Sequence, residues 1–325
     1  MNSRRVSLGL VAVLSVLGCD TTEESPCDVV VSSFRSLMPN SGSLNGTNLN
    51  GTNLNGKGIN GKGLNGKGTQ GQGAQGIGLQ GVALNGIALN GVGLNGVELV
   101  GTTLRATDAD GRTIEGSDLV GARLLARAAN REIELEIASV HEHGGLQWYG
   151  LTNGGESICG GDELGLFVDG VWDETGARRD ALSDDPTMTH TFSCAAGVIA
   201  KCVAWGYTPY EVGVDAHQTC TRLARADYCG DGQPHTADGT LVDVFDTLGV
   251  MEPDLSVDLE FEAGWGPRGA TCVSRPRYLE LDDAGREVEI PCWDALPACD
   301  DAEAAIATGA TLMNRSAPQT LCYAE

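Results

Sequence analysis

Two neighbouring pairs of cysteine and histidine are the residues in this chain whose types could support nucleophilic chemistry. His217 precedes Cys220 by three positions, and Cys229 precedes His235 by six. A thiolate held beside an imidazole is the arrangement that cysteine hydrolases use. Each of these cysteines could instead be oxidised to a disulfide. The export signal and the cysteine count, considered below, favour that second interpretation.

Metal binding is the second chemistry to weigh. His141 and His143 are two positions apart near the end of a predicted strand, so both could face one side and bind a metal, with an aspartate or His190 as third ligand. Histidines near a surface loop are more often solvated. Segment 231–243 is rich in Asp and Gly but lacks the ligand spacing of a calcium loop, which favours a structural turn. We predict no metal and no cofactor.

Hydrolysis by a pair of carboxylates is the third possibility. The chain has 44 acidic residues, and a pair suited to glycoside hydrolysis could lie among them. The sequence contains no G-x-S-x-G elbow, P-loop or H-E-x-x-H motif. We therefore assign no catalytic residue and favour a binding protein over an enzyme.

The N-terminus has the pattern of an export signal. Arg4 and Arg5 precede an apolar run over 6–17, about a dozen residues, which suits a secretory signal and is too short to span a bilayer. The run ends in Gly18-Cys19, which resembles the lipobox of bacterial lipoproteins. That resemblance implies cleavage before Cys19 and its acylation, including a palmitate-type chain.

A lipid on Cys19 would attach the protein to a bilayer. Each buried methylene contributes about 0.8 kcal/mol, so two or three acyl chains hold a protein at the membrane where one does not. Asp20 resembles an inner-membrane retention signal of enteric bacteria, a rule that does not transfer to all bacteria. We expect an extracytoplasmic protein in the cell envelope and favour the outer membrane over the inner.

The charge of the chain limits its partners. Cleavage before Cys19 removes two arginines and no acidic residue, which changes the net charge from -23 to -25. Such an acidic chain matches neither nucleic acid nor anionic lipid head groups. We expect the partner to be an envelope protein or a polysaccharide.

Ten cysteines remain after Cys19 is assigned to lipid. An even number in an exported chain predicts disulfides, here five, although the sequence does not define their connectivity. Cys27 lies only eight residues after the anchor, so it must reach across the long repeat region to pair, or pair with another chain. The candidates are Cys27, Cys159, Cys194, Cys202, Cys220, Cys229, Cys272, Cys292, Cys299 and Cys322.

A five-residue repeat occupies residues 44–127. Apolar residues recur every five positions, and a glycine lies two residues after nearly every one. The segment Thr47-Asn48-Leu49-Asn50-Gly51 resembles pentapeptide-repeat proteins, which implies a right-handed β-solenoid with inward Leu and Gly at corners. We expect that fold over 79–124. Lysines in residues 44–76 leave either a solenoid or a flexible stalk there. The in-phase positions include Leu44, Leu49, Leu54, Leu79, Leu84, Leu89, Leu94, Leu99, Leu104, Leu119 and Leu124.

A disulfide-rich α+β domain is expected over 128–325. Strict alternation predicts a strand at 132–137, and further strands are expected at 146–151, 164–172 and 255–261. Apolar residues at helical spacing predict helices at 195–205 and 214–228, with a short one at 302–307. Residues 1–18 form the signal peptide, and 19–43 form a lipid-anchored linker.

The segment Ala226-Asp227-Tyr228-Cys229 gives the most specific resemblance. With Asp238-Gly239-Thr240, Lys201-Cys202-Val203-Ala204-Trp205 and Cys272, it resembles the ADYC domain of lipoproteins of myxobacterial type. The resemblance implies an organisation with Leu-Asn-Gly repeats before the domain and implies no activity.

These observations predict a non-catalytic envelope protein that displays or binds a partner; the alternative is a lipid-anchored hydrolase of envelope or extracellular polymer. A shallow aromatic surface would favour binding. A deep cleft with converging carboxylates or a histidine-paired thiol would favour hydrolysis. The candidate aromatic residues are Trp148, Trp172, Trp205 and Trp265.

Overall fold

The computed structural model describes residues 78–322 with short gaps. Cys19, Cys27 and residues 44–77 lie outside the described residues, so the lipid anchor, the linker and the first half of the repeats stay predictions. The undescribed positions within 78–322 are 90–91, 94, 109, 129–130, 174, 180–187, 238–239, 257 and 282–285.

The first layer is a strongly curved antiparallel sheet. Its strands lie in the order β10, β11, β1, β6, β7, β8 and β9, with the short β2 (Val92–Gly93) beside β1. Gly165 of β10 also pairs with Tyr149 of β8, so the sheet closes on itself. The bounds are β1 Gly78–Leu89, β6 Arg123–Ala128, β7 Arg131–His143, β8 Leu146–Asn153, β9 Glu156–Ser157, β10 Gly165–Asp169 and β11 Met188–Cys194.

Alternation in the sequence explains how this sheet forms its core. Leu135 and Ile137 of β7 are fully buried, while Glu134 and Glu136 between and beside them are exposed. Because successive side chains of a strand point to opposite faces, one face of β7 packs inward. The predicted strand at 132–137 is confirmed. The core also contains Leu124, Ala126, Tyr149, Leu151, Phe167 and Phe192.

The second half of the repeats forms hairpins. Strands β3 (Asn95–Val100), β4 (Thr103–Thr107) and β5 (Thr113–Glu115) pair antiparallel. Leu99 lies opposite Leu104 across a two-residue turn, so a spacing of five places successive leucines on neighbouring strands. Gly101 has φ +65° in that turn, the conformation expected of the repeat glycines.

The structure therefore differs from the solenoid expected over 79–124. Leu104, Leu119 and Leu124 are buried, as the inward positions of the repeat should be. The chain reverses at its glycine turns, however, and the strands pair antiparallel instead of stacking as parallel coils. A hairpin with a two-residue turn and one side of a β-solenoid coil both repeat every five residues. Periodicity alone therefore does not distinguish the two folds.

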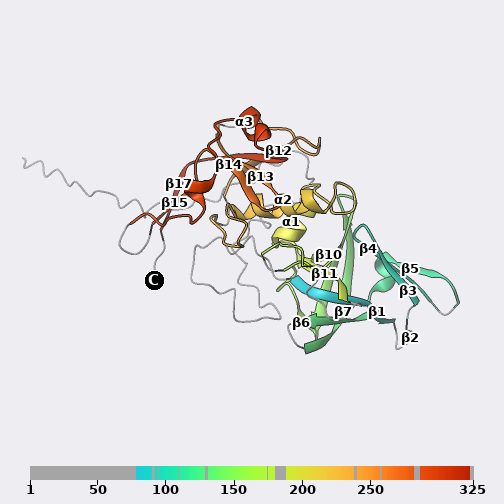
Figure 1. Ribbon diagram of the computed structural model, residues 1–325. Coiled ribbons are helices and arrows are strands. Elements are labelled where there is room, and N and C mark those ends of the chain that lie inside the picture. The colour runs from blue at the N-terminus through green and yellow to red at the C-terminus, as the bar shows by residue number, and fades with distance from the viewer. Residues whose placement is uncertain are drawn as a thin grey trace, which may run out of the picture.

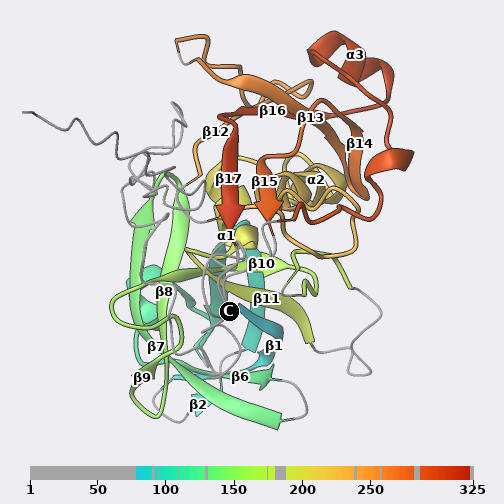
Figure 2. The same cartoon turned by 90° about the vertical axis from the view of Figure 1, so that its left-hand side faces the viewer.

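A second antiparallel sheet covers the other side of two helices. Its order is β12 (Val242–Asp246), β16 (Leu312–Ser316), β13 (Glu260–Gly266) and β14 (Gly269–Val273). Beside it, β15 (Tyr278–Leu281) and β17 (Gln319–Cys322) form a parallel pair. Helices α1 (Val198–Ala204) and α2 (Val214–Arg225) lie between the two large sheets (Figures 1 and 2).

One hydrophobic core joins both sheets through these helices. Trp148 and Trp172 come from the first sheet and its margin, Cys202 and Leu223 from the helices, and Trp265 from the second sheet. All five are at most 2% exposed. The described residues thus form a continuous packed unit. None of the described helices has the length and apolar character needed to cross a membrane.

The fold is mostly β, which corrects the expected α+β class. The helices predicted at 195–205 and 214–228 are present but shorter, as α1 and α2, and the helix predicted at 302–307 is present with those bounds as α3 (Ala302–Ala307). The strand expected at 255–261 starts only at Glu260, and Leu255 lies in a turn, 82% exposed. Several strands pair over long sequence distances and contain polar residues, so they carry little local signal.

Four disulfides cross-link the described residues, which confirms the prediction that the C-terminal domain is disulfide-bonded. Cys202–Cys220 joins α1 to α2, and Cys229–Cys292 joins the end of α2 to the 3-10 helix η3 (Trp293–Ala295). The other two bridges are Cys159–Cys194 and Cys272–Cys299. Cys27 and the side chain of Cys322 lie outside the described residues.

Peptide mapping of the non-reduced protein should recover these four linked pairs. The double change Cys202→Ala and Cys220→Ala removes a bridge that spans 18 residues, for which loop entropy predicts a loss of about 3 kcal/mol in unfolding free energy. The change Cys229→Ala with Cys292→Ala removes a bridge that spans 63 residues and should cost about 1 kcal/mol more. Denaturant unfolding measures both, and scrambled pairs in the map would contradict the structure.

Candidate functional site

The segment Ala226-Asp227-Tyr228-Cys229 ends helix α2 and organises the polar core beneath it. Ala226 is the C-cap of α2 and has φ +50°, the only positive φ of a non-glycine residue in the described part of the chain. Glycine usually occupies this left-handed position because it has no Cβ. The chain turns at Ala226, and each of the three residues that follow it makes contacts that fix this junction.

Asp227 anchors the loop that follows the helix. Its carboxylate pairs with Arg222 of α2 and accepts a hydrogen bond of 3.0 Å from the backbone N–H of Gly232. Burial raises the pKa of Asp227, and the charges of Arg222 and Arg225 oppose that shift. A buried carboxylate that binds a helix residue and a loop amide together fixes the exit of the chain from α2.

Tyr228 connects the helix end to the second sheet. Its hydroxyl donates to Glu262 Oε1 at 3.0 Å and accepts from the backbone N–H of Arg277 at 2.7 Å. Its ring stacks on Trp265 with centroids 5.1 Å apart and meets the edge of Trp293. Burial raises the pKa of Tyr228, so the hydroxyl stays protonated and available as a donor.

Arg277 and Glu262 form the buried ion pair at the centre of this network. Arg277 is 1% exposed, yet all five of its N–H donors bind acceptors. Two reach the two carboxylate oxygens of Glu262, each at 3.0 Å. The other three reach the carbonyls of Leu223 and Ala224 and the hydroxyl of Thr236. A cation at those carbonyls also opposes the negative end of the α2 dipole.

The carboxylate of Glu262 also has all of its hydrogen-bond acceptor positions filled. Its four hydrogen bonds come from Tyr228, twice from Arg277, and from the Ser316 hydroxyl at 2.6 Å. Burial raises the pKa of Glu262, but the charge of Arg277 and these hydrogen bonds outweigh it and leave the pKa below its usual value. A buried pair whose every donor and acceptor is used stabilises one arrangement of α2, β13 and β16.

Close backbone packing surrounds the motif. Gly230 has φ +67°, and a Cβ there would lie 1.9 Å from the carbonyl oxygen of Arg268. Cys229 is bonded to Cys292, which holds the same turn from the other side. The segment that carries the family-like tetrapeptide is therefore a structural junction of helix, sheet and loop.

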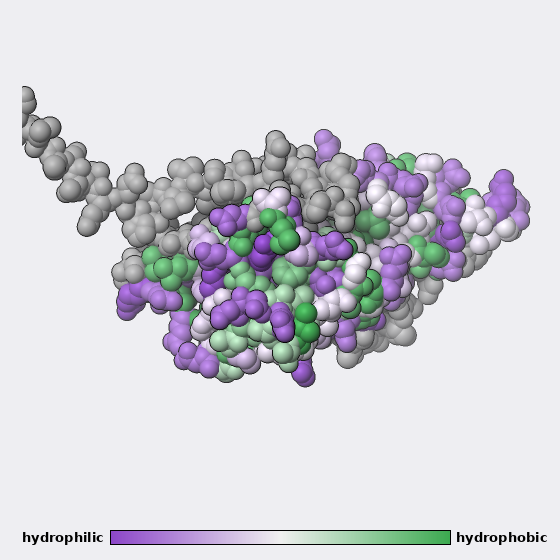
Figure 3. Space-filling view, turned by 90° about the horizontal axis from the view of Figure 1, so that it is seen from above, coloured by the Kyte–Doolittle hydropathy of each residue, from purple (hydrophilic) through white to green (hydrophobic). Residues whose placement is uncertain are grey.

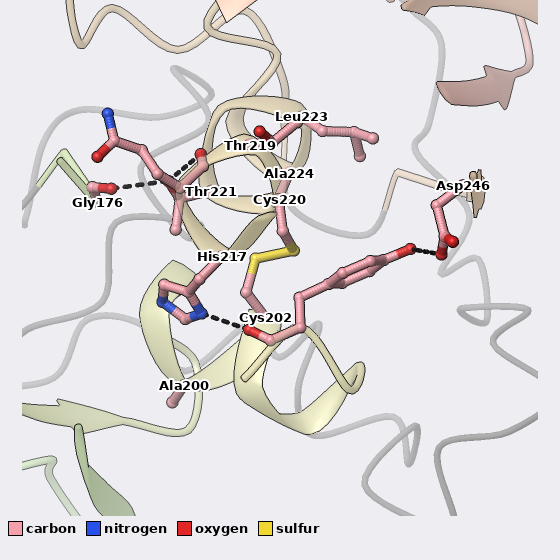
Figure 4. The surroundings of a disulfide bond; sticks show 12 residues. Gly176, Ala200, Cys202, His217, Thr219, Cys220, Thr221, Leu223, Ala224 and Asp246 are labelled. Atoms are coloured by element: carbon pink, nitrogen blue, oxygen red, sulfur yellow. Dashed lines mark hydrogen bonds between the residues drawn. A yellow bond between two sulfur atoms is a disulfide. The ribbon is translucent and has the colours of Figure 1, made fainter. Parts of the chain in front are cut away.

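His217 occupies a second buried polar site beside the Cys202–Cys220 bridge (Figure 4). Its Nδ1 donates to the carbonyl of Tyr207 at 2.6 Å, and its Nε2 has no hydrogen-bond partner among the described residues. The ring meets Trp172 edge-on at 4.6 Å. Tyr207 in turn donates from its hydroxyl to Asp246 at 2.7 Å. Burial lowers the pKa of His217 to about 4, so the ring is neutral.

Neither cysteine–histidine pair is a thiol site. Cys220 is bonded to Cys202 and Cys229 to Cys292, so neither sulfur is a thiolate. His235 binds a different partner, since its Nδ1 lies 2.8 Å from Glu280 Oε1. The prediction that both cysteines are oxidised is confirmed, and the two histidines make structural contacts.

The residues considered for metal binding are separated. His141 and His143 share one face of β7 near its end, while His190 lies on β11 with Nε2 3.8 Å from Asp169. No group of three or more His, Cys, Asp or Glu residues suited to a metal occurs in the described ranges. In segment 231–243, Asp231 accepts from the N–H of Gln233 and Asp243 pairs with Arg315, which are structural roles.

The tryptophans do not form the aromatic surface considered from the sequence. Trp148, Trp172 and Trp265 are at most 2% exposed and belong to the core, while Trp205 is half-buried. The residues that sequence reasoning missed are Arg277 and Glu262. Isolated charges in a strand pattern are usually solvated, so nothing local in the sequence distinguishes these two.

These features define a mostly β, disulfide-stapled domain organised around a buried Asp–Tyr–Cys turn at a helix end. The ADYC domain family model matches residues 116–279, about half of the chain, and the chain belongs to that family. The match includes the tetrapeptide, α2, Glu262 and Arg277, whereas Ser316 lies beyond it. No curated protein and no solved structure matches the chain.

Glu262→Gln should destabilise the domain strongly because it leaves the Arg277 guanidinium buried beside a neutral amide. Breaking a buried pair from one side costs about 3–5 kcal/mol. The exposed Glu134 gives a matched control, and Glu134→Gln should change the unfolding free energy by less than about 0.5 kcal/mol. Denaturant unfolding compares the two variants, and equal small effects would contradict the central role of Glu262.

His217 should make the domain less stable in acid. Its folded pKa of about 4 lies below the unfolded value of 6.5, so unfolding takes up a proton between these limits. The free energy of unfolding should therefore fall by up to about 3 kcal/mol as the pH drops from 6.5 to 4. His217→Gln removes this contribution and flattens the pH dependence of the melting temperature. The control variant His141→Gln changes an exposed histidine and should keep the wild-type pH dependence of the melting temperature. The same pH dependence in wild type and both variants would argue against this role of His217.

Proposed function

We propose that this protein is a non-catalytic, lipid-anchored component of the bacterial cell envelope that binds an envelope protein or a polysaccharide. The four disulfides carry the proposal, because such bridges form and persist outside the reducing cytoplasm. They agree with the export signal before Cys19. We place the protein on the extracytoplasmic side and favour the outer membrane.

The oxidised cysteines and the paired carboxylates favour a binding role over a catalytic role. Cys220 and Cys229 are oxidised, and the buried carboxylates of Asp227 and Glu262 are committed to arginines. A general acid or base needs a proton that it can exchange with substrate. Glu262 uses every acceptor position within the core instead. The hydrolase alternative receives no specific support from these groups.

A fifth bridge would connect the domain to its anchor. Eight of the ten cysteines other than Cys19 pair with one another, which leaves Cys27 and Cys322 by count. Cys322 is the last residue of β17, whose strand pairs with β15. We propose that Cys27 and Cys322 pair by donating two electrons and two protons to a thiol–disulfide exchange protein of the envelope.

This bridge would attach the described domain to the membrane through Cys27. Cys27 follows Cys19 by eight residues, a span of at most about 28 Å when fully extended. A lipid on Cys19 and a bridge at Cys27 would hold β17 close to the membrane.

Cys19→Ser should release the protein from the membrane fraction. The wild-type protein should partition into the detergent phase, and its N-terminal peptide should carry the mass of the lipid. The variant should lose that lipid and partition into the aqueous phase. Alkylation of the denatured, non-reduced wild-type protein should label no cysteine. A wild-type N-terminus without lipid would contradict the anchor, and two alkylated cysteines at Cys27 and Cys322 would contradict the fifth bridge alone.

A further inference from the structure

The outward face of the β3–β4–β5 sheet contains a polar hollow. It has a volume of about 360 Å³ and is lined by Glu98, Arg105, Ala106, Thr107, Thr113 and Glu115. The sheet lies at the end of the molecule opposite β15 and β17, where no other labelled element covers it (Figure 1). A ligand could therefore reach it without displacing part of the described fold.

The register of the three strands explains which side chains meet in the hollow. Arg105 of β4 lies directly opposite Glu98 on β3 and Glu115 on β5, and Thr107 lies opposite Thr113. Residues directly opposite in antiparallel strands have Cβ atoms about 5 Å apart. The sheet thus places a carboxylate, a guanidinium and a second carboxylate in one row, with two hydroxyls in the row beside it.

Several hydrogen-bonding groups in the first row are unused. Arg105 Nε donates to Glu115 at 2.7 Å, and its side chain remains 45% exposed. Neither Nη group of Arg105 has a hydrogen-bond partner among the described residues, and no hydrogen bond or ion pair joins Glu98 to them. The hollow therefore offers up to four N–H donors beside a free carboxylate acceptor.

The backbone under the hollow is held rigidly. Leu104 and Ala106, which flank Arg105 on β4, are at most 2% exposed and pack into the core of the first sheet. The Tyr149 hydroxyl accepts from the N–H of Leu104 at 2.8 Å and donates to the Thr102 carbonyl at 3.2 Å. Burial raises the pKa of Tyr149 to about 12, which keeps this hydroxyl protonated. A preorganised site binds a ligand at a smaller entropic cost.

The contrast with the rest of the surface supports this choice. From above, small apolar side chains gather over α3, and Ile306 there is 49% exposed (Figure 3). The β3–β5 end is largely hydrophilic in the same view.

The hollow suits a ligand with adjacent hydroxyl groups. A carboxylate accepts from one hydroxyl while a guanidinium donates to the next, so both polar functions of a sugar diol are met. Two carboxylates against one guanidinium leave one net negative charge in the row, which repels acidic polymers. We propose that the β3–β4–β5 face is a binding site for neutral or amino-substituted glycans, with Glu98 and Arg105 as the main contacts. The inference rests on the proposed binding role and names its ligand class.

The test measures binding of defined tetrasaccharides to the mature full-length protein in detergent by titration calorimetry. The neutral probes are chitotetraose, cellotetraose and maltotetraose, the amino probe is de-N-acetylated chitotetraose, and tetragalacturonate is the acidic probe. We expect at least one neutral or amino probe to bind with a dissociation constant of roughly 1 mM or below, and tetragalacturonate to bind at least about tenfold more weakly.

Matched variants locate the site. Glu98→Ala and Arg105→Ala should each weaken the best probe at least about tenfold. Arg123 and Glu134 form an exposed cross-strand pair at 3.0 Å that does not line the hollow, so Arg123→Ala and Glu134→Ala should leave affinity unchanged. All four changes remove only exposed contacts, so melting temperatures should stay near wild type.

Three results would overturn the inference. They are no binding of any neutral or amino probe at about 10 mM, preferential binding of tetragalacturonate, or binding that Glu98→Ala and Arg105→Ala leave intact. None of these results tests the lipid anchor, which the Cys19→Ser experiment tests separately.

Discussion

The buried ion pair between Arg277 and Glu262 is the contact on which the rest of this domain depends. An arginine removed from water must have every donor bound, and here the acceptors come from α2, the loop after it and β13. A shift of any one of these elements would leave a charged group unpaired in the core, which is costly. The pair therefore selects a single packing of helix and sheet.

The tetrapeptide of the family is best understood as the means of building this pair. Ala226 adopts the left-handed turn, Asp227 fixes the loop, Tyr228 binds both members of the pair, and Cys229 closes the turn covalently. Each residue type has a distinct physical task within four positions. Its place in the sequence reflects structural demands at a helix end.

The proposed function depends on a difference between the buried core, whose charged groups bind one another, and the β3–β4–β5 sheet, where charged groups remain exposed. Arg277 and Glu262 are paired with each other and buried, whereas Glu98 and the Nη groups of Arg105 at the far sheet remain available to solvent. A rigid, disulfide-stapled body can present such a face without rearranging. The repeats contribute to that face directly, because β3, β4 and β5 are built from their second half.

The sequence by itself determined the disulfide chemistry of the domain, the family resemblance and the local elements with strong periodicity, and it contains the pattern from which we predict an export signal. The strand at 132–137 and the helices around Cys202 and Cys220 belong to that set, because alternation and helical spacing are short-range signals. Tertiary structure alone decided the pairing of the cysteines, the mostly β class and the antiparallel use of the five-residue repeat. It also decided that Arg277 and Glu262 are buried, since the partners that make their burial possible lie far away in the chain.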